Sequence, residues 1–404
     1  MRDAHGRYGS ARNARQTRLT SPAEPHSATL GVKRQQPSRA NDRGGIDGDG
    51  ASLVVSSRTV FLLTCRDAET DFRRPLAEAL AAIGHEVFYI RLQRRPTLNR
   101  IGGDGPQTVS MPAFVAWMIR ACRSADRPLV FNSTNLVFPW LTTLLTTLCG
   151  GLWCFDMHDD LLYDKLGANR IRASRAQQRK LASSDLVVYA AATLSERFPE
   201  ARHLGNASDM VPAAHPFFDA SRVLILASLD QRVDFDFLDE VARLNPSVEF
   251  VIVGQVAEGA NTIAARLFRS TDHHRNIVYR GPYDSAGLIG LMAEFSLSLA
   301  PYRVNSRLTR YIDPLRYYHC LNSGLELLTT DIPQAHRLTE RLHILHAPAE
   351  FARVTLELNT NPAARRNANP QAHLTTWRQR AGTLMKIVEE YECAKDGSRH
   401  GRRE

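Results

Sequence analysis

Short runs of apolar residues alternate along the chain with longer segments in which apolar residues recur at helical spacing. The first run, "TVFLLTC", is followed by a segment in which Leu76, Leu80 and Ile83 share one helical face, and Gly84 then precedes the apolar run "EVFYI". Apolar runs without polar interruption are typical of parallel strands that are buried on both faces. The order strand, helix, glycine, strand indicates a right-handed crossover unit, so the pattern predicts an α/β fold.

The same unit recurs in two successive series. The first continues through "PLVFNS", "LWCFDM" and "DLVVYA", and the second opens at "RVLILAS" and continues through "VEFVIVG", "NIVYRG", "FSLSLAP" and "LELLTT". Two series of about 150 residues each predict two Rossmann-like domains. Residues 213–221 interrupt the pattern with proline and small residues, so the seam is expected there. The apolar run "LVFPWLTTLLTTLCGGLW" is expected to form a buried helix followed by a strand.

These patterns divide the chain into segments with different expected structures. In order, we predict a disordered basic tail at 1–57, a first Rossmann-like domain at 58–215, a second at 216–372, a C-terminal helix at 373–392 and a tail at 393–404.

Composition and charge exclude several classes of protein. The 404 residues carry a formal net charge of +9, and residues 1–58 alone hold ten basic and five acidic residues. The predicted domains contain no basic cluster with aromatic partners, so we expect no nucleic-acid partner. No uninterrupted apolar run reaches the roughly 20 residues that a bilayer span requires. The basic arm could touch anionic headgroups in a peripheral membrane contact, but a solvated tail is the simpler interpretation.

Cysteine usage and missing motifs narrow the prediction further. Six cysteines occur without a CxxC pair, and the first residues lack the apolar core of a signal peptide, which favours free thiols in a reducing compartment. We therefore expect a cytoplasmic protein, with peripheral attachment at the inner membrane face left open. No GxGxxG follows the first strand and no GxxxxGK[ST] occurs, which excludes dinucleotide oxidoreductases and P-loop proteins.

The segment "YIDPLRYYHCLNSGLELLTTDIP", residues 311–333, carries the main candidate chemistry. Asp313 is a suitable N-cap, Pro314 suits a first helical turn, and Gly324 suits the end of the helix. Arg316 and His319 then share one side near the helix start. A helix N-terminus binds phosphate through free N–H groups, and an arginine there adds a bidentate contact.

His319 could hydrogen-bond a ribose hydroxyl or a base edge from that position. From the residues alone, a second interpretation is equally good: Arg316 pairs with a surface carboxylate, and His319 is an ordinary helix residue with its hydrogen bonds satisfied.

The same segment resembles one found in GT-B glycosyltransferases of the family-four type. There a sequence like "NPLKLYEYLAAGKPVVSTDIP" stands where this chain reads "DPLRYYHCLNSGLELLTTDIP". The upstream block "NIVYRGPYDSAGLIGLMAEFSLSLAPYRVN", the turn "ARHLGNASD" and the late helix "TTWRQRA" are also similar to elements of that family, so the resemblance covers roughly residues 58–390. It implies two Rossmann-like domains that face each other across a cleft, with a C-terminal helix that crosses back toward the first.

The resemblance also implies roles for single residues. The second domain would hold a nucleotide-activated sugar, with Arg316 at the position of a lysine near the diphosphate and His319 at the position of a glutamate that holds the ribose diol. Tyr311 stands where the two-glutamate form of the family has its first acidic residue. A neutral imidazole accepts one hydrogen bond and lacks the bidentate, charged contact of glutamate. We also place Asp313, Pro314 and Thr309 in the donor site. Arg303 and Arg310 could add phosphate charge there or be solvated surface arginines, and for Arg307 the surface is favoured.

A second cluster, "DMHDD", follows a predicted strand, where ligands of open α/β sheets gather. The resemblance places His158 near the donor sugar. Asp159 or Asp160 could orient or deprotonate an acceptor hydroxyl, or one of them could cap the next helix. We expect no metal site. Asp234 and Asp236 come just before a helical pattern, so helix capping explains their presence. The His273–His274 pair has no further ligands at suitable spacing.

Together these features predict a metal-independent glycosyltransferase, specifically a hexosyltransferase, without a cofactor. Its partners would be a nucleotide-sugar donor and a glycan or lipid-linked acceptor. A catalytically degenerate GT-B protein that binds nucleotide or glycan, or acts as a scaffold, is the alternative that the histidine at position 319 motivates. A sugar-nucleotide epimerase is a third and less favoured reading.

Overall fold

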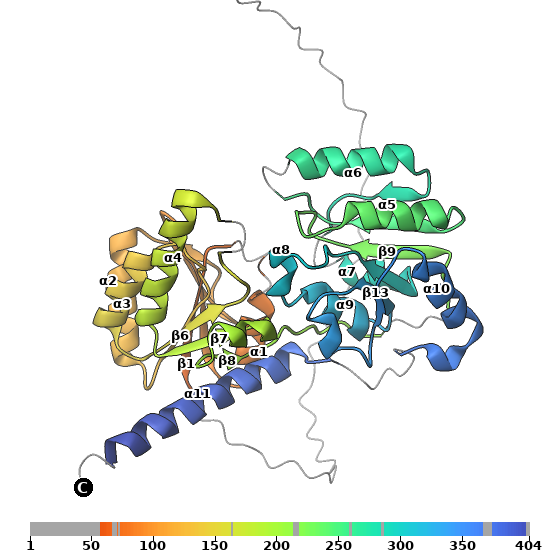
Figure 1. Ribbon diagram of the computed structural model, residues 1–404. Helices are drawn as coiled ribbons and strands as arrows, with labels where there is room; N and C mark the ends of the chain where they lie inside the picture. Colours follow the sequence, from red (N-terminus) through yellow and green to blue (C-terminus); the bar gives the residue numbers. More distant parts are fainter. Residues whose placement is uncertain are drawn as a thin grey trace, which may run out of the picture. The chain divides into compact units, whose positions relative to one another are not determined.

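Two mainly parallel sheets form the framework of the computed structural model (Figure 1). The structure describes residues 57–66, 71, 73–162, 165–212, 218–257, 261–283, 287–366 and 374–400. Residues 1–56 of the expected tail and residues 213–217 of the expected seam lie outside this part of the chain.

The first sheet has eight strands in the order β4-β3-β2-β1-β5-β6-β7-β8. All neighbours are parallel except at the β4 edge, where β3 pairs antiparallel with β2 and with β4. Apolar β1 occupies the centre, as its uninterrupted sequence predicts. The strands are β1 (Thr59–Thr64), β2 (Glu86–Arg91), β3 (Thr97–Arg100), β4 (Gln107–Thr108), β5 (Leu129–Asn132), β6 (Leu152–Met157), β7 (Leu186–Tyr189) and β8 (Arg202–His203).

Helices cover both faces of this sheet because successive strand residues point to opposite sides. Val60 and Leu62 of β1 pack in one core with α1 (Arg74–Ala82) and α11 (Trp377–His400). Phe61 and Leu63 pack in another with α2 (Met111–Ser124) and α3 (Pro139–Cys149), and α4 (Gly167–Ala182) lies beside α3. A short 3-10 helix, η1 (Ala192–Glu196), follows β7.

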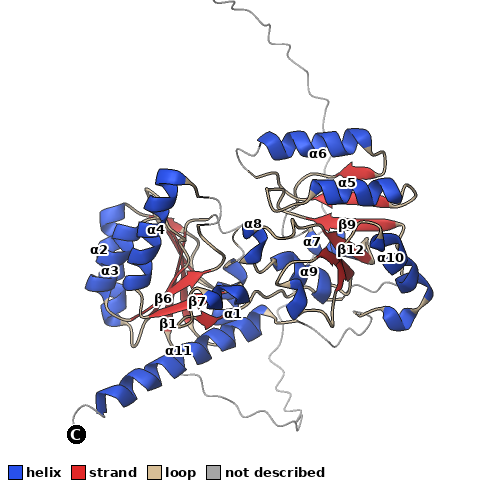
Figure 2. Cartoon of the chain, in the orientation of Figure 1, coloured by secondary structure: helices blue, strands red, loops and turns tan. Residues whose placement is uncertain are grey.

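The second sheet has six parallel strands in the order β11-β10-β9-β12-β13-β14. They are β9 (Arg222–Leu226), β10 (Glu249–Val253), β11 (Ile277–Tyr279), β12 (Leu297–Ala300), β13 (Glu326–Thr330) and β14 (His343–Leu345). One face packs against α5 (Phe235–Leu244), α6 (Asn261–His273) and α10 (Glu350–Thr360), and the other against α7 (Leu288–Ala293) and α9 (Leu315–Asn322). The remaining short elements are α8 (Arg307–Arg310), η2 (Ala335–Arg337) and η3 (Pro362–Ala364). The predicted pair of Rossmann-like domains is confirmed (Figure 2).

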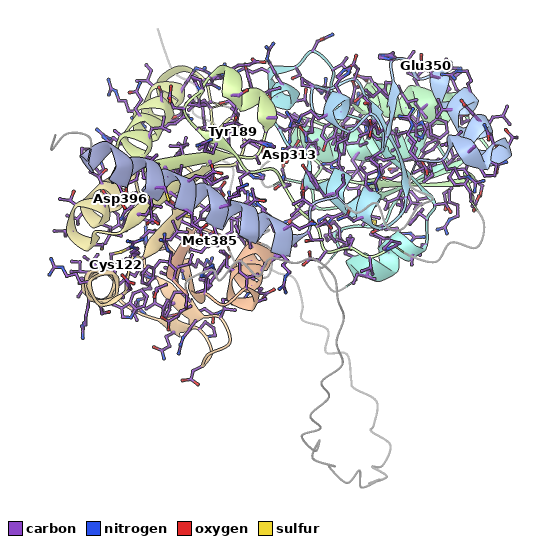
Figure 3. The ribbon with its side chains drawn as sticks, turned by 90° about the horizontal axis from the view of Figure 1, so that it is seen from below. Cys122, Tyr189, Asp313, Glu350, Met385 and Asp396 are labelled. Carbon is purple, nitrogen blue, oxygen red and sulfur yellow. The ribbon has the colours of Figure 1, made fainter. Side chains whose placement is uncertain are left out.

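The C-terminal helix is longer than the sequence indicated. α11 continues to His400, through residues that we assigned to a tail. Its apolar residues, among them Trp377, Leu384 and Met385, join the core of the first sheet although the second sheet precedes α11 in the sequence. Figure 3 shows α11, with Met385 labelled, lying across the elements of the first domain.

Helix α3 differs from its expected burial. Thr142, Leu145 and Cys149 are buried as predicted, but the opposite side of the helix exposes Trp140, Leu144 and other apolar residues. The error has a simple cause: an apolar run reports hydrophobicity, and it does not report whether neighbouring elements are available to cover every face. In the part of the chain that the structure describes, no helix combines the length and the apolar character that crossing a bilayer requires.

Gly254 allows the ends of β9 and β10 to approach each other closely. Its φ angle is +149°, and a Cβ atom at this position would lie 1.6 Å from the carbonyl oxygen of Ala227. The backbone N–H of Gly254 donates to the carbonyl of Gly281 (2.8 Å). A side chain at position 254 is therefore incompatible with this arrangement, which shapes the edge of the second sheet.

Candidate functional site

A cavity of about 570 Å³ contains residues from both sheets. Its lining residues follow the carboxyl ends of strands, where open α/β sheets place their ligands. Arg66 follows β1, His158 and Asp159 follow β6, and the remaining wall comes from the second sheet and the start of α9. These second-sheet residues are Leu226, Ala227, Ser228, Asp230, Arg232, Gln255, Ala257, Tyr283, Tyr302, Ile312, Asp313, Pro314, Leu315, Arg316 and His319.

Arg316 stands in the first turn of α9 and lines this cavity. Its guanidinium carbon lies 4.8 Å from the ring centroid of the buried Tyr302, a cation–π arrangement that holds the side chain in place. The N–H groups of a first helical turn have no acceptor within the helix. In α9 the Tyr317 N–H donates to the Pro314 carbonyl (2.9 Å), so Arg316 and the earlier N–H groups of this turn present positive charge and donors on the same wall.

The start of α9 is built differently from the expectation. Pro314 occupies the N-cap position, and no side chain caps the helix there, so the predicted N-cap role of Asp313 is wrong. The carboxylate of Asp313 instead accepts hydrogen bonds from the Asn206 N–H (2.7 Å), the Tyr318 hydroxyl and Gln334 Nε2 (2.6 Å). Burial raises the pKa of Asp313 to about 7.

Asp313 thus ties the start of α9 to the segment that follows β8. Asn206 Nδ2 also donates to the carbonyl of Asp313 (2.6 Å), and the buried Arg380 of α11 donates to Asn206 Oδ1 (2.9 Å). At the other end of α9, Gly324 has a φ angle of +82° directly after the helix, which confirms its predicted role in ending it.

His319 lies one turn further along α9. Its Nδ1 pairs with the Ser208 hydroxyl at 2.8 Å, which leaves Nε2 as the ring atom available to a ligand. Burial lowers the pKa of His319 to about 4, so the imidazole is neutral at physiological pH. A neutral imidazole can donate or accept one hydrogen bond, consistent with the expected contact to a hydroxyl.

Arg232 adds a second guanidinium to the same wall. It forms several hydrogen bonds to the carboxylate of Asp230, including Nε to Oδ1 at 3.0 Å and Nη2 to Oδ2 at 2.6 Å. Its Nη1 lies 3.9 Å from Oδ2 of Asp159, across from the first sheet. Asp230 fixes the orientation of Arg232 and neutralises part of its charge.

His158 and Asp159 form the opposite wall. His158 Nε2 and Asp159 Oδ1 are 3.9 Å apart, and both side chains are largely buried. Burial, reinforced by Arg73 and Arg380, holds the pKa of His158 well below its usual range. Burial also raises the pKa of Asp159 to about 6, although Arg232 and the backbone N–H of Asp313 oppose that shift. The buried Oδ1 atom of Asp159 accepts no hydrogen bond within the described part of the chain.

Asp160 has a different environment from its neighbour. Its side chain does not line the cavity. One carboxylate oxygen pairs with Arg197 (2.9 Å) and accepts from the Leu162 N–H (3.0 Å), and the other lies 3.4 Å from Arg307. The predicted capping role is wrong, because α4 has Leu166 at its N-cap and no side-chain cap there. The contacts of Asp160 instead leave its carboxylate inaccessible to an acceptor.

Residues 303–310, earlier in the segment before α9, are absent from the lining of the main cavity. The Thr309 hydroxyl donates to the Arg303 carbonyl (2.6 Å), and Arg310 pairs with Glu196 (2.9 Å). Arg303, Thr309 and Arg310 are therefore not brought together with Arg316. Thr309 and Arg310 instead border a separate cavity of about 590 Å³ with His336 and His346.

Several lining residues were missed by the sequence analysis, notably Arg66, Asp230, Arg232 and Tyr302. All four follow a strand of a parallel sheet within a few residues. The rule that ligands gather at carboxyl strand ends predicts such positions, but these four residues lie outside residues 311–333 and the "DMHDD" cluster.

The residues set aside as metal ligands have structural contacts. Asp234 caps α5 by accepting from the Phe237 N–H (3.1 Å), which confirms its predicted role, and Asp236 pairs with Arg266. His273 ends α6, with its Nδ1 at 2.8 Å from the Arg269 carbonyl. Among the residues that the structure describes, no group of three or more His, Cys, Asp or Glu side chains is arranged to hold a metal ion.

Comparisons with known proteins agree with this architecture. No protein-family model matches the sequence, and no curated protein sequence does so. The sucrose-phosphate synthase of Thermosynechococcus elongatus superposes with a TM-score of 0.61 at 16% identity, over 83% of this chain and 100% of that one. HepE of Anabaena, solved with UDP and glucose, gives 0.57 at 14% identity over 82% and 99%.

An α-glucosyltransferase solved with UDP and a 13-mer DNA gives a TM-score of 0.58 at 10% identity, over 82% of this chain and 100% of that one. At identities this low, structural similarity establishes only the fold, and the activity has to be inferred from the residues of the site. The chain has the GT-B fold of these glycosyltransferases, as its sequence predicted.

Proposed function

We propose that the chain is a glycosyltransferase that moves a sugar, specifically a hexose, from a nucleoside-diphosphate sugar to an acceptor hydroxyl in the synthesis of a glycan, exopolysaccharide or glycolipid. One observation carries the proposal. A single cavity has Arg232, Arg316 and the start of α9 on one wall, and His158 and Asp159 on the other. Guanidinium groups and a helix start suit a diphosphate, and a desolvated carboxylate suits a hydroxyl.

The structural relatives support the same conclusion. HepE was solved with UDP and glucose, and the α-glucosyltransferase was solved with UDP. A uridine nucleotide is therefore the first donor to test. The family-four resemblance of the segment around Arg316 adds the expectation that the diphosphate lies beside that residue.

The proposed reaction uses the two walls for different steps. When the bond between the sugar and the diphosphate breaks, its electron pair remains on the diphosphate oxygen, and Arg316, Arg232 and the first turn of α9 stabilise the added charge. These fixed positive groups support a metal-independent reaction, so activity is expected to persist in EDTA. Asp159, ionised at neutral pH, orients the acceptor hydroxyl or takes its proton. His158 stays neutral and donates or accepts a hydrogen bond near the sugar.

Thermal unfolding with uridine, guanosine and adenosine diphosphates tests the proposal directly. We expect one nucleotide to raise the unfolding temperature, and Arg316→Ala to weaken its binding about 10- to 100-fold through loss of a charged hydrogen bond. Arg353→Ala removes an exposed arginine of α10 and is the matched control. A panel in which no nucleotide stabilises the protein would contradict the proposal.

The alternative is a GT-B module that binds nucleotide or glycan without turnover, motivated by His319 at the position of a family glutamate. The same preparations distinguish the two. Nucleotide binding accompanied by donor hydrolysis or transfer supports the enzyme. Nucleotide binding without turnover over a broad set of donors and acceptors supports the module.

A further inference from the structure

The layer formed by α2, α3 and α4 combines an apolar strip with unopposed positive charge. Helix α3 contains no charged residue, and Trp140, Leu144 and Leu148 recur at intervals of four along its outer side. Their exposed fractions are 67%, 48% and 36%. Three large apolar side chains in a row on an outer helix are unusual for a surface that faces only water.

Neighbouring segments extend this strip. Val137 precedes α3 and is 45% exposed, Leu166 precedes α4 and is 80% exposed, and Ile171 in α4 is 56% exposed. Helix α3 packs against α4 on one side and against α2 on the other (Figure 1). We call these six residues, Val137, Trp140, Leu144, Leu148, Leu166 and Ile171, the apolar strip.

Charge on the flanking helices has a single sign. Helices α2, α3 and α4 contain no aspartate or glutamate, whereas α2 and α4 together contain six arginines in addition to the buried Lys180. Arg172 and Arg175 of α4 are exposed. Arg179 lies over the Trp140 ring at 3.8 Å from its centroid, so basic and apolar groups meet at the strip itself.

The outer helices of the second sheet make a useful contrast. Arg243 pairs with Glu240 in α5, Arg266 pairs with Asp239, and Arg353 lies 3.8 Å from Glu357 in α10. Exposed apolar residues there, such as Phe268 in α6 and Leu356 in α10, stand singly. Mixed charges and isolated apolar residues are typical of an ordinary solvated surface.

We propose that the apolar strip and the arginines beside it dock onto an anionic lipid bilayer. Tryptophan and leucine insert at the level of the headgroups, and arginines on both sides pair with lipid phosphates. The absence of acidic residues from all three helices favours an anionic lipid surface over a second copy of this chain, whose matching face would bring like charges together.

The position of the strip fits this partner. Helix α3 follows β5 and α4 follows β6, so Val137, Trp140 and Leu166 lie near the sheet edge at which His158 and Asp159 enter the cavity. A chain docked through this layer would hold that edge close to the headgroups. The docking itself requires no nucleotide, so it stands or falls independently of the proposed enzymatic activity.

Cosedimentation of the full chain with vesicles tests the docking. We expect binding to phosphatidylcholine vesicles with about one third phosphatidylglycerol, much weaker binding to phosphatidylcholine alone, and weakening by added salt. Trp140→Gln with Leu144→Gln should weaken binding about tenfold or more. Each arginine near an anionic surface contributes about 1 kcal/mol to binding, so Arg172→Gln with Arg175→Gln should weaken binding about 30-fold.

Matched control variants show whether vesicle binding depends on the apolar strip or on other exposed surfaces. Phe268→Gln with Leu356→Gln removes equally exposed apolar residues from the second sheet's helices, and Arg243→Gln with Arg353→Gln removes two charges there; both pairs should bind vesicles as the native chain does. Tryptophan fluorescence adds an independent signal, because Trp140 is exposed whereas Trp117 is half-buried and Trp153 and Trp377 are buried.

Three results would overturn the proposal. The native chain could fail to bind anionic vesicles. The Trp140/Leu144 variant could bind as tightly as its control, which would assign the binding elsewhere, for example to the basic N-terminal segment. Sedimentation could instead show a dimer that the Trp140/Leu144 variant dissociates, which would assign the strip to a second copy of the chain. Each variant's unfolding temperature should match that of the native chain, since the altered side chains are exposed.

Discussion

The two walls of the main cavity use opposite electrostatics. On the wall from the second sheet, Arg232 and Arg316 carry permanent charge and are held by Asp230 and by the Tyr302 ring. On the wall from the first sheet, burial favours the uncharged forms: it lowers the pKa of His158 and raises the pKa of Asp159 to about 6. Fixed positive charge, suited to binding a diphosphate, therefore lies on the wall from the second domain, whereas the carboxylate proposed to take a proton lies on the wall from the first. Variants that alter one wall at a time test this difference.

The largest expected effect comes from the framework of the second wall. Gly254→Ala places a methyl group where the Ala227 carbonyl oxygen already lies, at a φ angle that favours glycine. We expect the free energy of unfolding to fall by more than about 4 kcal/mol, or the folded protein to be lost. Gly290→Ala is the control, because a Cβ atom there meets nothing within 4 Å. Chemical denaturation of both variants measures the difference, and equal stabilities would show that the strand ends can separate.

The next effect concerns the first wall and should change turnover without changing nucleotide affinity. Asp159→Asn removes the proposed base, so kcat should fall about 10²- to 10⁴-fold. Asp160→Asn tests the neighbouring carboxylate, which is occupied by Arg197 and Arg307. That variant should lower the free energy of unfolding by about 3 kcal/mol while keeping kcat within a fewfold of native. Reversed results would exchange the roles of the two carboxylates.

The pH profile of turnover follows from the same carboxylate. A base must be unprotonated, and the pKa of Asp159 is raised to about 6. The rate of transfer should therefore drop as the pH falls through 6 and level off above it. Asp159→Asn should remove this step from the residual activity. A rate that is unchanged between pH 5 and 7 would argue against proton transfer to Asp159.

Nucleotide affinity should respond more modestly to His319. Removing its single hydrogen bond in His319→Ala should weaken donor binding about 5- to 10-fold. Because the pKa of His319 is lowered to about 4, its imidazole should stay neutral between pH 5.5 and 8, so His319→Ala should weaken donor binding by the same factor across this range. Calorimetry with an intact nucleotide-sugar measures both. Tighter binding below pH 6.5 that disappears in His319→Ala would show that the imidazole becomes charged in the complex.

The architecture could be predicted from the sequence because the patterns that indicate strands and helices depend on residues close together in the chain. The apolar run at Thr59–Thr64 and the helix that ends at Gly324 depend on neighbours within a few residues. Arg316, His319, His158 and Asp159 could be selected as candidate site residues for the same reason, because each stands near the end of a predicted strand or the start of a predicted helix.

Other features depend on residues distant in the sequence and could not be read from such patterns. The direction of the Asp313 side chain is set by Asn206, Tyr318 and Gln334, and only Tyr318 lies within five positions of it. The occupied carboxylate of Asp160 depends in the same way on Arg197 and Arg307. The exposure of the apolar strip depends on which elements cover the first sheet, and this is a property of the assembled domain.

The position of α11 has a consequence for how the chain is made. Its apolar residues complete the core beneath β1 and α1, yet they are the last part of that core to leave the ribosome. While the second domain is being synthesised, the first domain lacks α11, so the face that includes Val60 and Leu80 stays partly uncovered. Nascent chains that stop before Trp377 are accordingly the ones expected to need a chaperone.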